Sequence, residues 1–406
     1  MAKFNVGVIG LGARGGWWIR DILCTYPNVE VTALCDVYED RLEKSKNDVL
    51  SKTGKAPALL TTDYKELISS PLVNTVLVFS SWDNHFDAAL RSMEAGKPVG
   101  IEVGGAYNID QCFELVKTHE RTGTPIMLLE NCCYGEIELT VTHMVRQGVL
   151  GNIVHCEGGY HHDLRHQIGL IEDERHYRHA EYKNRNCENY PTHELGPIAK
   201  LLNINNGNRF VSLVSMASKS QGMTDYLTAK DSPLASVHFA QGDIFTTLIK
   251  CANGETIKIT LDTTLPRFYS RNFTVRGTKG LYEEATNSVF LDAEHSDKHF
   301  DWKPEWNNME KYMEDYRHPL WKEYREGGIK GGHGGMDYLV ISAFFEALEN
   351  NTPMPIDVYD AAAWMAITAL SEESAALGSQ PVLVPDFTHG QWKYKKAPLE
   401  SRYNLR

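Results

Sequence analysis

A tyrosine and a histidine three residues apart, Tyr190 and His193 in the stretch YPTHELGP of residues 190–197, have side chains suited to proton transfer. An imidazole titrates near neutral pH, and a phenol can donate or accept a hydrogen bond. On these residues alone two other interpretations stay open. The stretch could be a packed helix start with Thr192 as its N-cap, or it could contribute ligands to a metal site.

A glycine-rich turn near the N-terminus has the spacing of a dinucleotide site. Gly10, Gly12 and Gly15 form GxGxxG in VGVIGLGARGGWW, directly after an apolar strand pattern and at a helix start. The glycines permit a tight turn and the approach of a pyrophosphate, which the free N–H groups of the helix would bind. Asp36 ends the second strand, where a carboxylate accepts hydrogen bonds from ribose hydroxyls and repels a 2′-phosphate. We therefore predict NAD as the cofactor, with Arg14 among its contacts.

Two further polar loops follow predicted strands. SSWDNHFDAAL carries Trp82 and His85, and GKPVGIEVGG carries Glu102 and Val103. Open α/β sheets bind ligands at the carboxyl ends of their strands, so these four residues are candidate cofactor contacts. Taken by themselves, they are only polar loops at a favourable edge of a sheet.

Histidine and cysteine spacing does not indicate a metal site. The run YHHDLRHQIGLIEDERHYRH, residues 160–179, is rich in histidine, but it lacks the HExxH spacing of a catalytic zinc site. The eight cysteines include no CxxC pair, and in a chain this long they suggest reduced, mostly buried side chains. We predict that the protein binds no metal.

Composition indicates a soluble globular protein with a sizeable core. The chain has 406 residues, enough for two domains, and 42% of them are hydrophobic and 23% charged. A net charge of -12 argues against nucleic acid or an anionic membrane as partner. The opening MAKFNVGVIG leads straight into a strand, which predicts a cytoplasmic protein as written, or an exported one if a leader was removed.

The elements that must position these residues fall into two groups. Within the first 130 residues, five short apolar runs alternate with helical patterns, and this alternation predicts an α/β Rossmann domain with a parallel sheet. Later segments at 152–163, 210–218, 235–241, 243–264 and 272–284 predict a large, mostly antiparallel sheet. Residues 292–332 suggest a long surface excursion, and 337–351 and 357–378 suggest helices. We predict a Rossmann NAD-binding domain over 1–133 and an α+β substrate-binding and oligomerisation domain over 134–406.

The glycine loop, the loop ending in His85, the GKPV stretch and GVLGNIVHCEGGY resemble, in this order, the Gfo/Idh/MocA superfamily of NAD(P)-dependent sugar oxidoreductases. Ordinary members of that superfamily carry Glu-Lys-Pro after the fourth strand, where the lysine exchanges a proton with the reacting carbinol. This chain has Glu102-Val103-Gly104 instead, and valine cannot move a proton. The usual dehydrogenase arrangement therefore lacks its central group.

Longer strings closely resemble a narrower branch, glycoside hydrolase family 109. They span nearly the whole chain: ENCCYGEIELT, YPTHELGPIAKLLNINNGNRFVSLVSM, PRFYSR, GGHGGMDY, VYDAAAW and VPDFTHG. The name-giving members of that family are NAD-dependent α-N-acetylgalactosaminidases, so the resemblance implies a retaining glycosidase with tightly bound NAD. Glycine usually follows the YPTH string in the branch, whereas this chain has Glu194, and this difference leaves the exact sugar open.

The resemblance also implies a reaction course. Family members oxidise the sugar transiently at C3, lose the C2 proton as the aglycone leaves C1, add water, and re-reduce C3. This course requires proton-transfer groups near the C3 hydroxyl, near C2 and at the leaving oxygen. His193 is our candidate at the C3 hydroxyl. Tyr190 is our candidate near C2 or the leaving oxygen, where its neighbours would have to lower its pKa.

Other site residues are implied by the same resemblance. Tyr160, Arg178 and Tyr269 match substrate-binding positions of the family. Each also suits a sugar, since a tyrosine offers a stacking face and an arginine a fork of donors. Asn131 matches a cofactor contact. His333, in GGHGGMDY, is an active-site candidate without an assigned role, and Asp337 either orients it or caps the following helix.

We therefore predict a catalytic set of Tyr190, His193, His333 and Tyr269, with Thr192 among the substrate contacts. A conventional sugar dehydrogenase and a non-catalytic NAD-dependent sugar sensor are the alternatives. A glycosidase releases the aglycone without net NADH, a dehydrogenase accumulates NADH, and a sensor does neither. Relatives commonly assemble through the outer face of the second-domain sheet, so we expect a homo-oligomer acting on a small carbohydrate.

Overall fold

The N-terminal part of the chain forms the predicted parallel Rossmann sheet. The computed structural model describes residues 4–169, 175–297 and 301–405, and the side chain of Glu194 lies outside the described part. Six strands lie in the order β3-β2-β1-β4-β5-β6, and all are parallel. Their bounds are β1 Phe4–Ile9, β2 Val29–Cys35, β3 Leu59–Thr61, β4 Thr75–Val78, β5 Val99–Ile101 and β6 Ile126–Leu128. The five apolar runs predicted five of these strands, and the short β3 is additional.

Helices cover this sheet as the helical patterns predict. They are α1 Ala13–Asp21, η1 Leu23–Thr25, α2 Glu39–Thr53, α3 Tyr64–Ser69, α4 Trp82–Glu94 and α5 Ile109–Thr122. Gly54 and Gly123 follow α2 and α5 in the left-handed conformation, with φ of 72° and 68°. Both glycines are the C-caps of their helices, because a side chain disfavours this conformation.

A second, eight-stranded sheet follows η2 Asn131–Tyr134 and α6 Glu136–Arg146. Its order is β13-β12-β11-β7-β10-β9-β8-β14, and only the β10–β7 pair is parallel, so the prediction of a mostly antiparallel sheet is confirmed. The strands are β7 Ile153–His161, β8 Phe210–Ala217, β9 Ile244–Cys251, β10 Thr256–Asp262, β11 Thr274–Gly277, β12 Gly280–Glu283, β13 Ser288–Leu291 and β14 Val382–Leu383. The domain boundary proposed after residue 133 falls inside η2 and stays a prediction.

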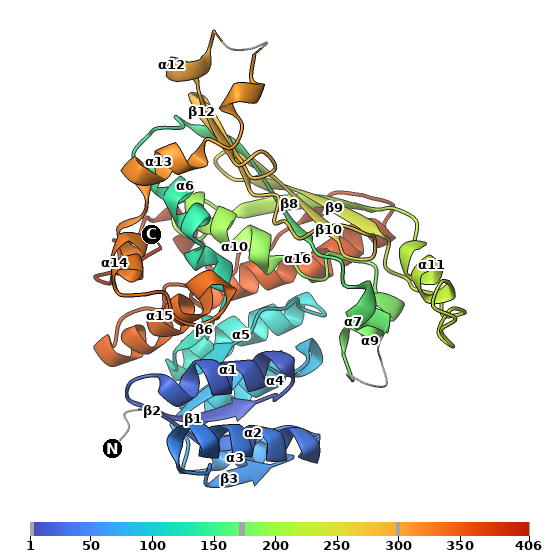
Figure 1. Cartoon of the computed structure of the whole chain (residues 1–406), viewed down its shortest axis with the longest axis vertical. Coiled ribbons are helices and arrows are strands. Elements are labelled where there is room, and N and C mark those ends of the chain that lie inside the picture. The colour runs from blue at the N-terminus through green and yellow to red at the C-terminus, as the bar shows by residue number, and fades with distance from the viewer. Residues whose placement is uncertain (1–3, 170–174, 298–300, 406) are drawn as a thin grey trace.

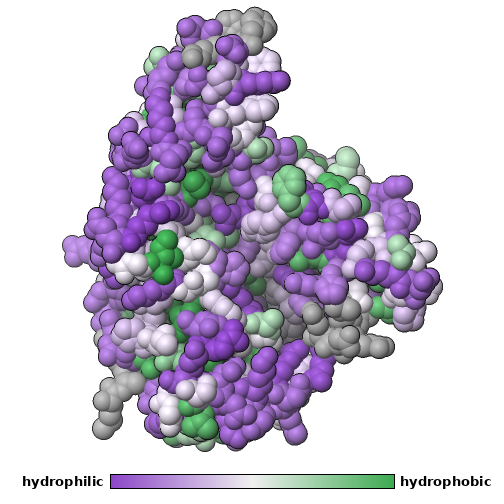
Figure 2. All heavy atoms as spheres, viewed as in Figure 1, coloured by the Kyte–Doolittle hydropathy of each residue, from purple (hydrophilic) through white to green (hydrophobic). Residues whose placement is uncertain are grey.

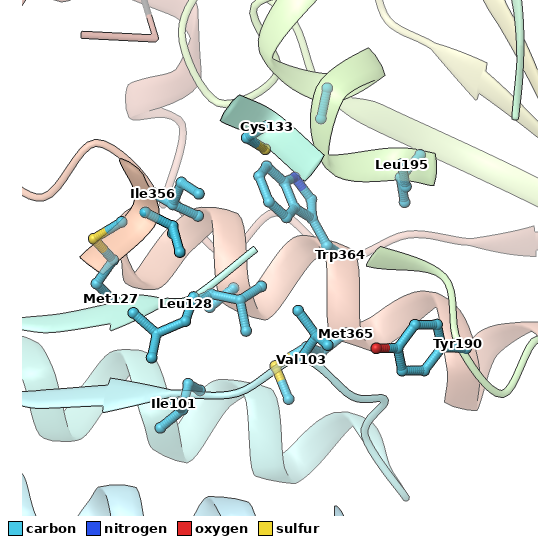
Figure 3. Packing of buried hydrophobic residues seen from close by; sticks show 14 of the residues in the cluster. Ile101, Val103, Met127, Leu128, Cys133, Tyr190, Leu195, Ile356, Trp364 and Met365 are labelled. Carbon is cyan, nitrogen blue, oxygen red and sulfur yellow. The ribbon is translucent and has the colours of Figure 1, made fainter. Parts of the chain in front are cut away.

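Two helices of the second part connect the two sheets. α10, Thr192–Leu201, packs on β7 and η2, and α16, Val358–Ala376, packs on α5, β6 and β8 (Figure 1). Figure 3 shows Trp364 and Met365 of α16 between Leu128 of β6 and Leu195 of α10. Trp364 and Met365 are completely buried. The core is therefore continuous between the two parts of the chain.

The remaining described helices lie at the periphery of the second sheet or return toward the first. They are α7 Arg165–Gly169, α9 Arg178–Asn184, α11 Gly222–Thr228, α12 Asp292–His295, η3 Lys303–Glu305, α13 Met309–Tyr316, α14 Pro319–Glu326, η4 His333–Gly335, α15 Met336–Asn350 and η5 Gln391–Lys393. Within the described ranges no helix is long and apolar enough to cross a membrane.

Two sequence-based expectations about these segments are wrong. The predicted surface excursion at 292–332 contains α13 and α14, and α13 packs on α6 with Met309, Tyr312 and Met313 buried. Their spacing is that of an amphipathic helix, which the many polar and aromatic neighbours obscured. Residues 235–241 form turns and loop instead of a strand. Phe239 in that segment is buried, but it packs against His179 and not in a sheet.

Candidate active site

The glycine loop has the close contacts that a dinucleotide turn requires. Gly10 has φ of +91°, and a Cβ there would lie 2.4 Å from the Ser80 nitrogen. A Cβ at Gly15 would lie 2.0 Å from the Gly10 oxygen, so both positions accept only glycine. Gly12 differs, because a Cβ there would meet only Arg41, at 3.5 Å or beyond. The loop therefore has an open face at Gly12, at the N-terminus of α1, where a pyrophosphate fits.

Asp36 lies beside this loop as predicted. Its two carboxylate oxygens accept hydrogen bonds from the Leu11 nitrogen at 2.7 Å and the Tyr38 nitrogen at 3.0 Å. These bonds orient the carboxylate at the end of β2, and each oxygen keeps a lone pair for a ribose hydroxyl. The residues at this end of the sheet thus fit the adenosine half of NAD.

Arg14 connects the strand ends of the Rossmann sheet to the start of α15. Its Nε donates to Glu102 at 2.6 Å, and its two terminal nitrogens donate to the Asp337 carboxylate at 2.9 and 2.8 Å. Asp337 also accepts from Asn131 Nδ2 at 2.7 Å and lies 2.6 Å from His333 Nδ1. These predicted cofactor contacts therefore form one hydrogen-bonded network, which also holds His333.

The network determines the charge of Asp337. Burial by itself would raise the pKa of this carboxyl group, but the hydrogen bonds from His333 and Arg14 outweigh it and hold the pKa well below its usual range. Asp337 is consequently an anion that orients the His333 ring. Of the two roles that the sequence left open for Asp337, the geometry favours the orienting one, since the N-cap of α15 is Gly335.

A second cluster forms around the stretch that opens the sequence analysis. The Tyr190 hydroxyl lies 3.4 Å from His193 Nε2, and His193 Nδ1 lies 2.8 Å from Glu130 Oε1. Glu130 lies two residues after the end of β6 and is completely buried. The two clusters therefore meet at neighbouring residues, since Glu130 contacts the histidine and Asn131 contacts Asp337.

Aromatic rings and an arginine surround Tyr190. The Tyr160 ring lies 4.4 Å from the Tyr190 ring between centroids. The Arg178 guanidinium lies 5.4 Å from the Tyr190 ring and 5.7 Å from the Trp82 ring. Tyr269 meets Tyr160 edge-on at 6.4 Å and is half exposed. These five side chains come from segments between residues 82 and 269, and the fold brings them together at one place.

Figure 3 shows one member of this cluster, Tyr190, at the carboxyl edge of the Rossmann sheet. The Tyr190 hydroxyl points toward the end of β5, where Val103 lies. Trp82 Nε1 donates to the Val103 carbonyl at 3.1 Å, which ties the loop after β4 to the loop after β5. Figure 2 shows the molecular surface hollowed near its centre, between the Rossmann part below and the α7–α9 lobe at the right. The arrangement suits a polar ring-shaped ligand lying against a nicotinamide.

One chemical expectation about Tyr190 is not met. A role as a base required neighbours that lower its pKa, but burial raises the pKa of Tyr190 well above its usual value, and Tyr160 and Glu102 add to this effect. The nearby Arg178 acts in the opposite direction and does not compensate. Tyr190 is therefore a neutral phenol in this structure, suited to donating a proton or a hydrogen bond.

Some predicted contact residues are buried against protein. His85 Nε2 contacts the Ser80 carbonyl at 2.8 Å, and burial lowers the pKa of this histidine. Thr192 is completely buried, and it is the first residue of α10, whose N-cap is Pro191. The alternative interpretation of Thr192 as the helix cap is therefore wrong. Val103 is also buried.

One group in the described ranges has the spacing of metal ligands: Glu130, Cys132 and His193, whose ligand atoms lie within 4.8 Å of one another. Glu130 and His193 are already paired by a hydrogen bond, and Cys132 Sγ lies 2.9 Å from Arg271 Nη1. Burial raises the pKa of the Cys132 thiol, which disfavours the thiolate that binds metals. We interpret the group as a hydrogen-bonded carboxylate–imidazole pair, and the absence of a metal stays a prediction.

The sequence did not single out Glu130, Tyr177 or Gln167. Tyr177 packs on Trp82 at 4.9 Å, and Gln167 accepts a hydrogen bond from Arg178 at 3.1 Å. The sequence could have indicated Glu130, because it is the acidic residue that ends the apolar pattern of the last Rossmann strand. Residues at that end of a strand lie at the ligand-binding edge of an open sheet. No comparable signal marks the other two, since Gln167 lies in α7 and Tyr177 is the N-cap of α9.

Comparisons with known proteins agree over nearly the whole chain. The protein-family model described as "Glycosyl hydrolase 109, C-terminal domain" matches residues 134–394, and "Oxidoreductase family, NAD-binding Rossmann fold" matches residues 4–129. A "Glycosyl hydrolase family 109 protein" of Stenotrophomonas maltophilia (strain K279a) is 39% identical, covering 97% of this chain and 91% of the relative. An "Alpha-N-acetylgalactosaminidase" of Tannerella forsythia is 37% identical, covering 96% of this chain and 87% of the relative.

Solved structures show the same fold at lower identity. Levoglucosan dehydrogenase in complex with NADH and levoglucosan has a TM-score of 0.68 at 16% identity, covering 94% of this chain and 99% of that chain. The scyllo-inositol dehydrogenase of Lactobacillus casei, with bound NAD(H) and scyllo-inositol, has a TM-score of 0.65 at 13% identity, covering 93% and 98%. These similarities concern the fold alone.

Proposed function

This chain belongs to glycoside hydrolase family 109 and is an NAD-dependent glycoside hydrolase, and we propose that it releases terminal α-linked N-acetylgalactosamine. The relative from Tannerella forsythia carries the name of that activity. The observation that carries the proposal is the hydrogen-bonded series Tyr190–His193–Glu130. It lies at the edge of the sheet near Val103, the position at which a dehydrogenase of the superfamily would have a lysine.

We assign the sugar to the space bounded by Tyr160, Tyr190 and Arg178. Aromatic rings provide faces for the apolar side of a hexose, and the guanidinium provides donors for its hydroxyl and amide oxygens. Tyr269, being half exposed, lies at the rim, where it can contact the aglycone side. This placement supports substrate binding by Tyr269 in preference to the catalytic role that the sequence suggested.

Asp36, the open face at Gly12 and the Arg14 network would hold NAD, and NAD supplies a reversible hydride acceptor for the sugar C3. His193 Nε2 then accepts the proton of the C3 hydroxyl, because Nδ1 is occupied by Glu130. Tyr190, as a neutral phenol, donates its proton to the leaving oxygen, and the phenolate so formed takes up the proton lost from C2. The overall reaction adds water to a glycoside and leaves no net NADH.

His333 does not join the Tyr190–His193 pair in this proposal. It contacts Asp337 and Arg14, and its ring meets Trp17 edge-on at 6.4 Å. Its side chain is 55% exposed. We assign His333 to the cofactor side of the site, where it can shield the bound dinucleotide from solvent.

A screen of p-nitrophenyl glycosides tests the proposal. Both anomers of N-acetylated, neutral and acidic sugars are offered, and nitrophenol and the NADH absorbance are followed in one cuvette. We expect nitrophenol from the α-N-acetylgalactosaminide with no net NADH. NADH accumulating with free sugars, while every aryl glycoside stays intact, would contradict the proposal in favour of a dehydrogenase. Binding of a sugar without either signal would indicate a sensor.

Oligomeric state and location follow as further parts of the proposal. Hydrophobic side chains on the strands of the second sheet are strongly exposed, among them Met216 of β8, Leu248 of β9 and Leu383 of β14. We propose a homo-oligomer that covers this sheet face. The cytoplasmic location stays a prediction, which fractionation of cells with an antibody to the protein would test.

A further inference from the structure

A short segment from the second part of the chain contacts the Rossmann part on both sides of the NAD site. It comprises residues 175–178, which lead into α9, and we call it the strap. Figure 1 shows α7 and α9 below the second sheet, on the side that faces the Rossmann part. The two ends of the strap bind different portions of the cofactor site.

The first residue of the strap lies at the adenosine side. Arg175 Nη1 donates to Asp40 Oδ1 at 2.9 Å, and its guanidinium lies 4.3 Å from the centre of the Tyr38 ring. The hydrogen bond from Arg175 lowers the pKa of Asp40, which is therefore an anion at pH 7. The Tyr38 nitrogen donates to Asp36, the carboxylate assigned to the ribose. Arg175 thus holds the segment that orients the ribose-binding carboxylate.

The strap also lies near the glycine loop. Arg41 Nη1 is 3.8 Å from Asp36 Oδ2, and a Cβ at Gly12 would lie 3.5 Å from the same nitrogen. Burial, Arg178 and Arg41 together lower the pKa of His176 to about 4, so the second strap residue is neutral and close to Arg41. The strap therefore approaches the open face on which the pyrophosphate fits.

The other end of the strap lies at the nicotinamide side. The Tyr177 ring is 4.9 Å from the Trp82 ring, and the Arg178 guanidinium is 5.7 Å from it. Trp82 Nε1 donates to the Val103 carbonyl, at the strand ends where the nicotinamide is assigned. Arg178 donates to Gln167 at 3.1 Å, which connects this end of the strap to α7. The strap consequently crosses the crevice in which an open α/β sheet binds a dinucleotide.

From these contacts we propose that the strap retains NAD through successive turnovers, and that Arg175 is the residue that holds the strap to the Rossmann part. A dinucleotide bound along the strand ends is enclosed by the strap and leaves when Arg175 separates from Asp40 and Tyr38. Retention suits this hydrolase, because its reaction leaves no net NADH and needs no exchange of cofactor. The proposal requires bound NAD but no particular sugar.

Arg165 provides a matched control. It donates to the Asp163 carboxylate at 2.8 and 2.6 Å, and its guanidinium lies 4.9 Å from the Tyr226 ring. These are the same kinds of contact that Arg175 makes, but both partners belong to the second part of the chain. Arg165→Gln therefore removes similar interactions from the same lobe without releasing the strap from the Rossmann part.

Exchange of the bound cofactor tests the proposal. Protein loaded with radiolabelled NAD is mixed with an excess of unlabelled NAD, and the label that stays on the protein is followed over time. We expect Arg175→Gln to release NAD about 5- to 10-fold faster than wild type, since it loses an ion pair and a cation–π contact. Release from Arg175→Gln no faster than from Arg165→Gln would overturn the proposal.

A double-mutant cycle tests whether Asp40 is the partner through which Arg175 acts. Asp40→Asn should also accelerate release, but by less, because the contact of Arg175 with Tyr38 remains. The double variant should release NAD no faster than Arg175→Gln, since both substitutions remove one shared interaction. Effects that multiply in the double variant would overturn the assignment of the pair.

Salt dependence gives a second readout on the loaded protein. Salt screens an exposed ion pair, so raising sodium chloride from about 0.05 to 0.5 M should accelerate release more from wild type than from Arg175→Gln. Equal acceleration in both would overturn the role of the ion pair. Thermal midpoints measured at equal NAD verify that the variants are folded. None of these measurements uses a glycoside, so a failure of the proposed hydrolysis would leave their outcome unchanged.

Discussion

Tyr190 is the residue whose chemical role the structure changes most. Burial and the neighbouring Tyr160 and Glu102 raise its pKa, so the proposed reaction uses Tyr190 as a proton donor and not as a base. Tyr190→Phe should therefore lower kcat by about 10²- to 10³-fold for substrates whose leaving group needs a proton. Aryl glycosides of increasing leaving-group pKa measure this dependence.

The expected result for Tyr190→Phe is a loss that grows as the leaving group becomes more basic. A nitrophenyl substrate needs little protonation and should be affected least. The Tyr160–Tyr190 ring contact survives in the phenylalanine variant, so substrate affinity and NAD content serve as the controls. A loss of the same size for all leaving groups would contradict the assignment as an acid.

The contribution of Asp337 to the free energy of unfolding should depend on pH with a definite sign. Its folded-state pKa lies below the unfolded value of about 3.9, so its stabilising contribution is present above that value and is lost as the pH falls below it. Asp337→Asn should lower the free energy of unfolding by roughly 3 kcal/mol at pH 7, since it removes one of the two carboxylates that pair with Arg14. The difference between wild type and variant should shrink below about pH 4.

Urea denaturation at pH 7 and at pH 3.5, with equal NAD in all samples, checks the Asp337 prediction. Equal NAD is needed because a cofactor that binds only the folded state adds to stability. A wild-type advantage that stays constant across this range would show that Asp337 contributes through packing and not through its charge.

At the scale of elements, α10 is the helix on which the site depends. Gly196 lies against Glu130 and Trp364, so the helix approaches η2 and α16 as closely as a glycine permits. Gly196→Ala should cost about 1–3 kcal/mol of unfolding free energy by overpacking, although alanine is the better helix former. It should also lower kcat, because the added methyl group displaces the Glu130 side chain.

Gly16→Ala in α1 is the matched control for Gly196→Ala. A Cβ at Gly16 would meet only the Leu11 oxygen at 3.5 Å, which is ordinary contact. This substitution should therefore leave the urea midpoint unchanged or raise it. Similar destabilisation by the two substitutions would contradict the close packing inferred for α10.

At the scale of the whole molecule, the exposed face of the second sheet predicts assembly. Leu248→Glu in β9 places a charge among exposed hydrophobic side chains, and we expect it to convert the oligomer to smaller species. Light scattering coupled to size exclusion measures the change. Leu50→Glu in α2 is the control, since Leu50 is about as exposed, at 42% against 46%, but lies on the Rossmann part. A wild-type monomer would contradict the prediction.

The sequence by itself determined the elements and the cofactor class. The informative patterns are local: apolar runs, helical spacing, and GxGxxG followed by Asp36. Each reflects the backbone conformation and the buried face of a single segment and its neighbours in the chain. The spacing of Tyr190 and His193 marked them as candidates for proton transfer, and the family resemblance added their roles. The prediction from local patterns was wrong at Met309 and Tyr312 of α13. These residues belong to a packed helix, whereas their segment was predicted to be a surface excursion.

Only the tertiary structure decided how the site residues act. Glu130 and His193 are 63 residues apart, and Arg14 and Asp337 are 323 apart, so no local pattern joins them. The pKa of Tyr190 depends on burial and on neighbours from several segments, which the fold alone brings together. The physical reason is that electrostatic interaction and desolvation depend on distances in space and not on distance along the chain.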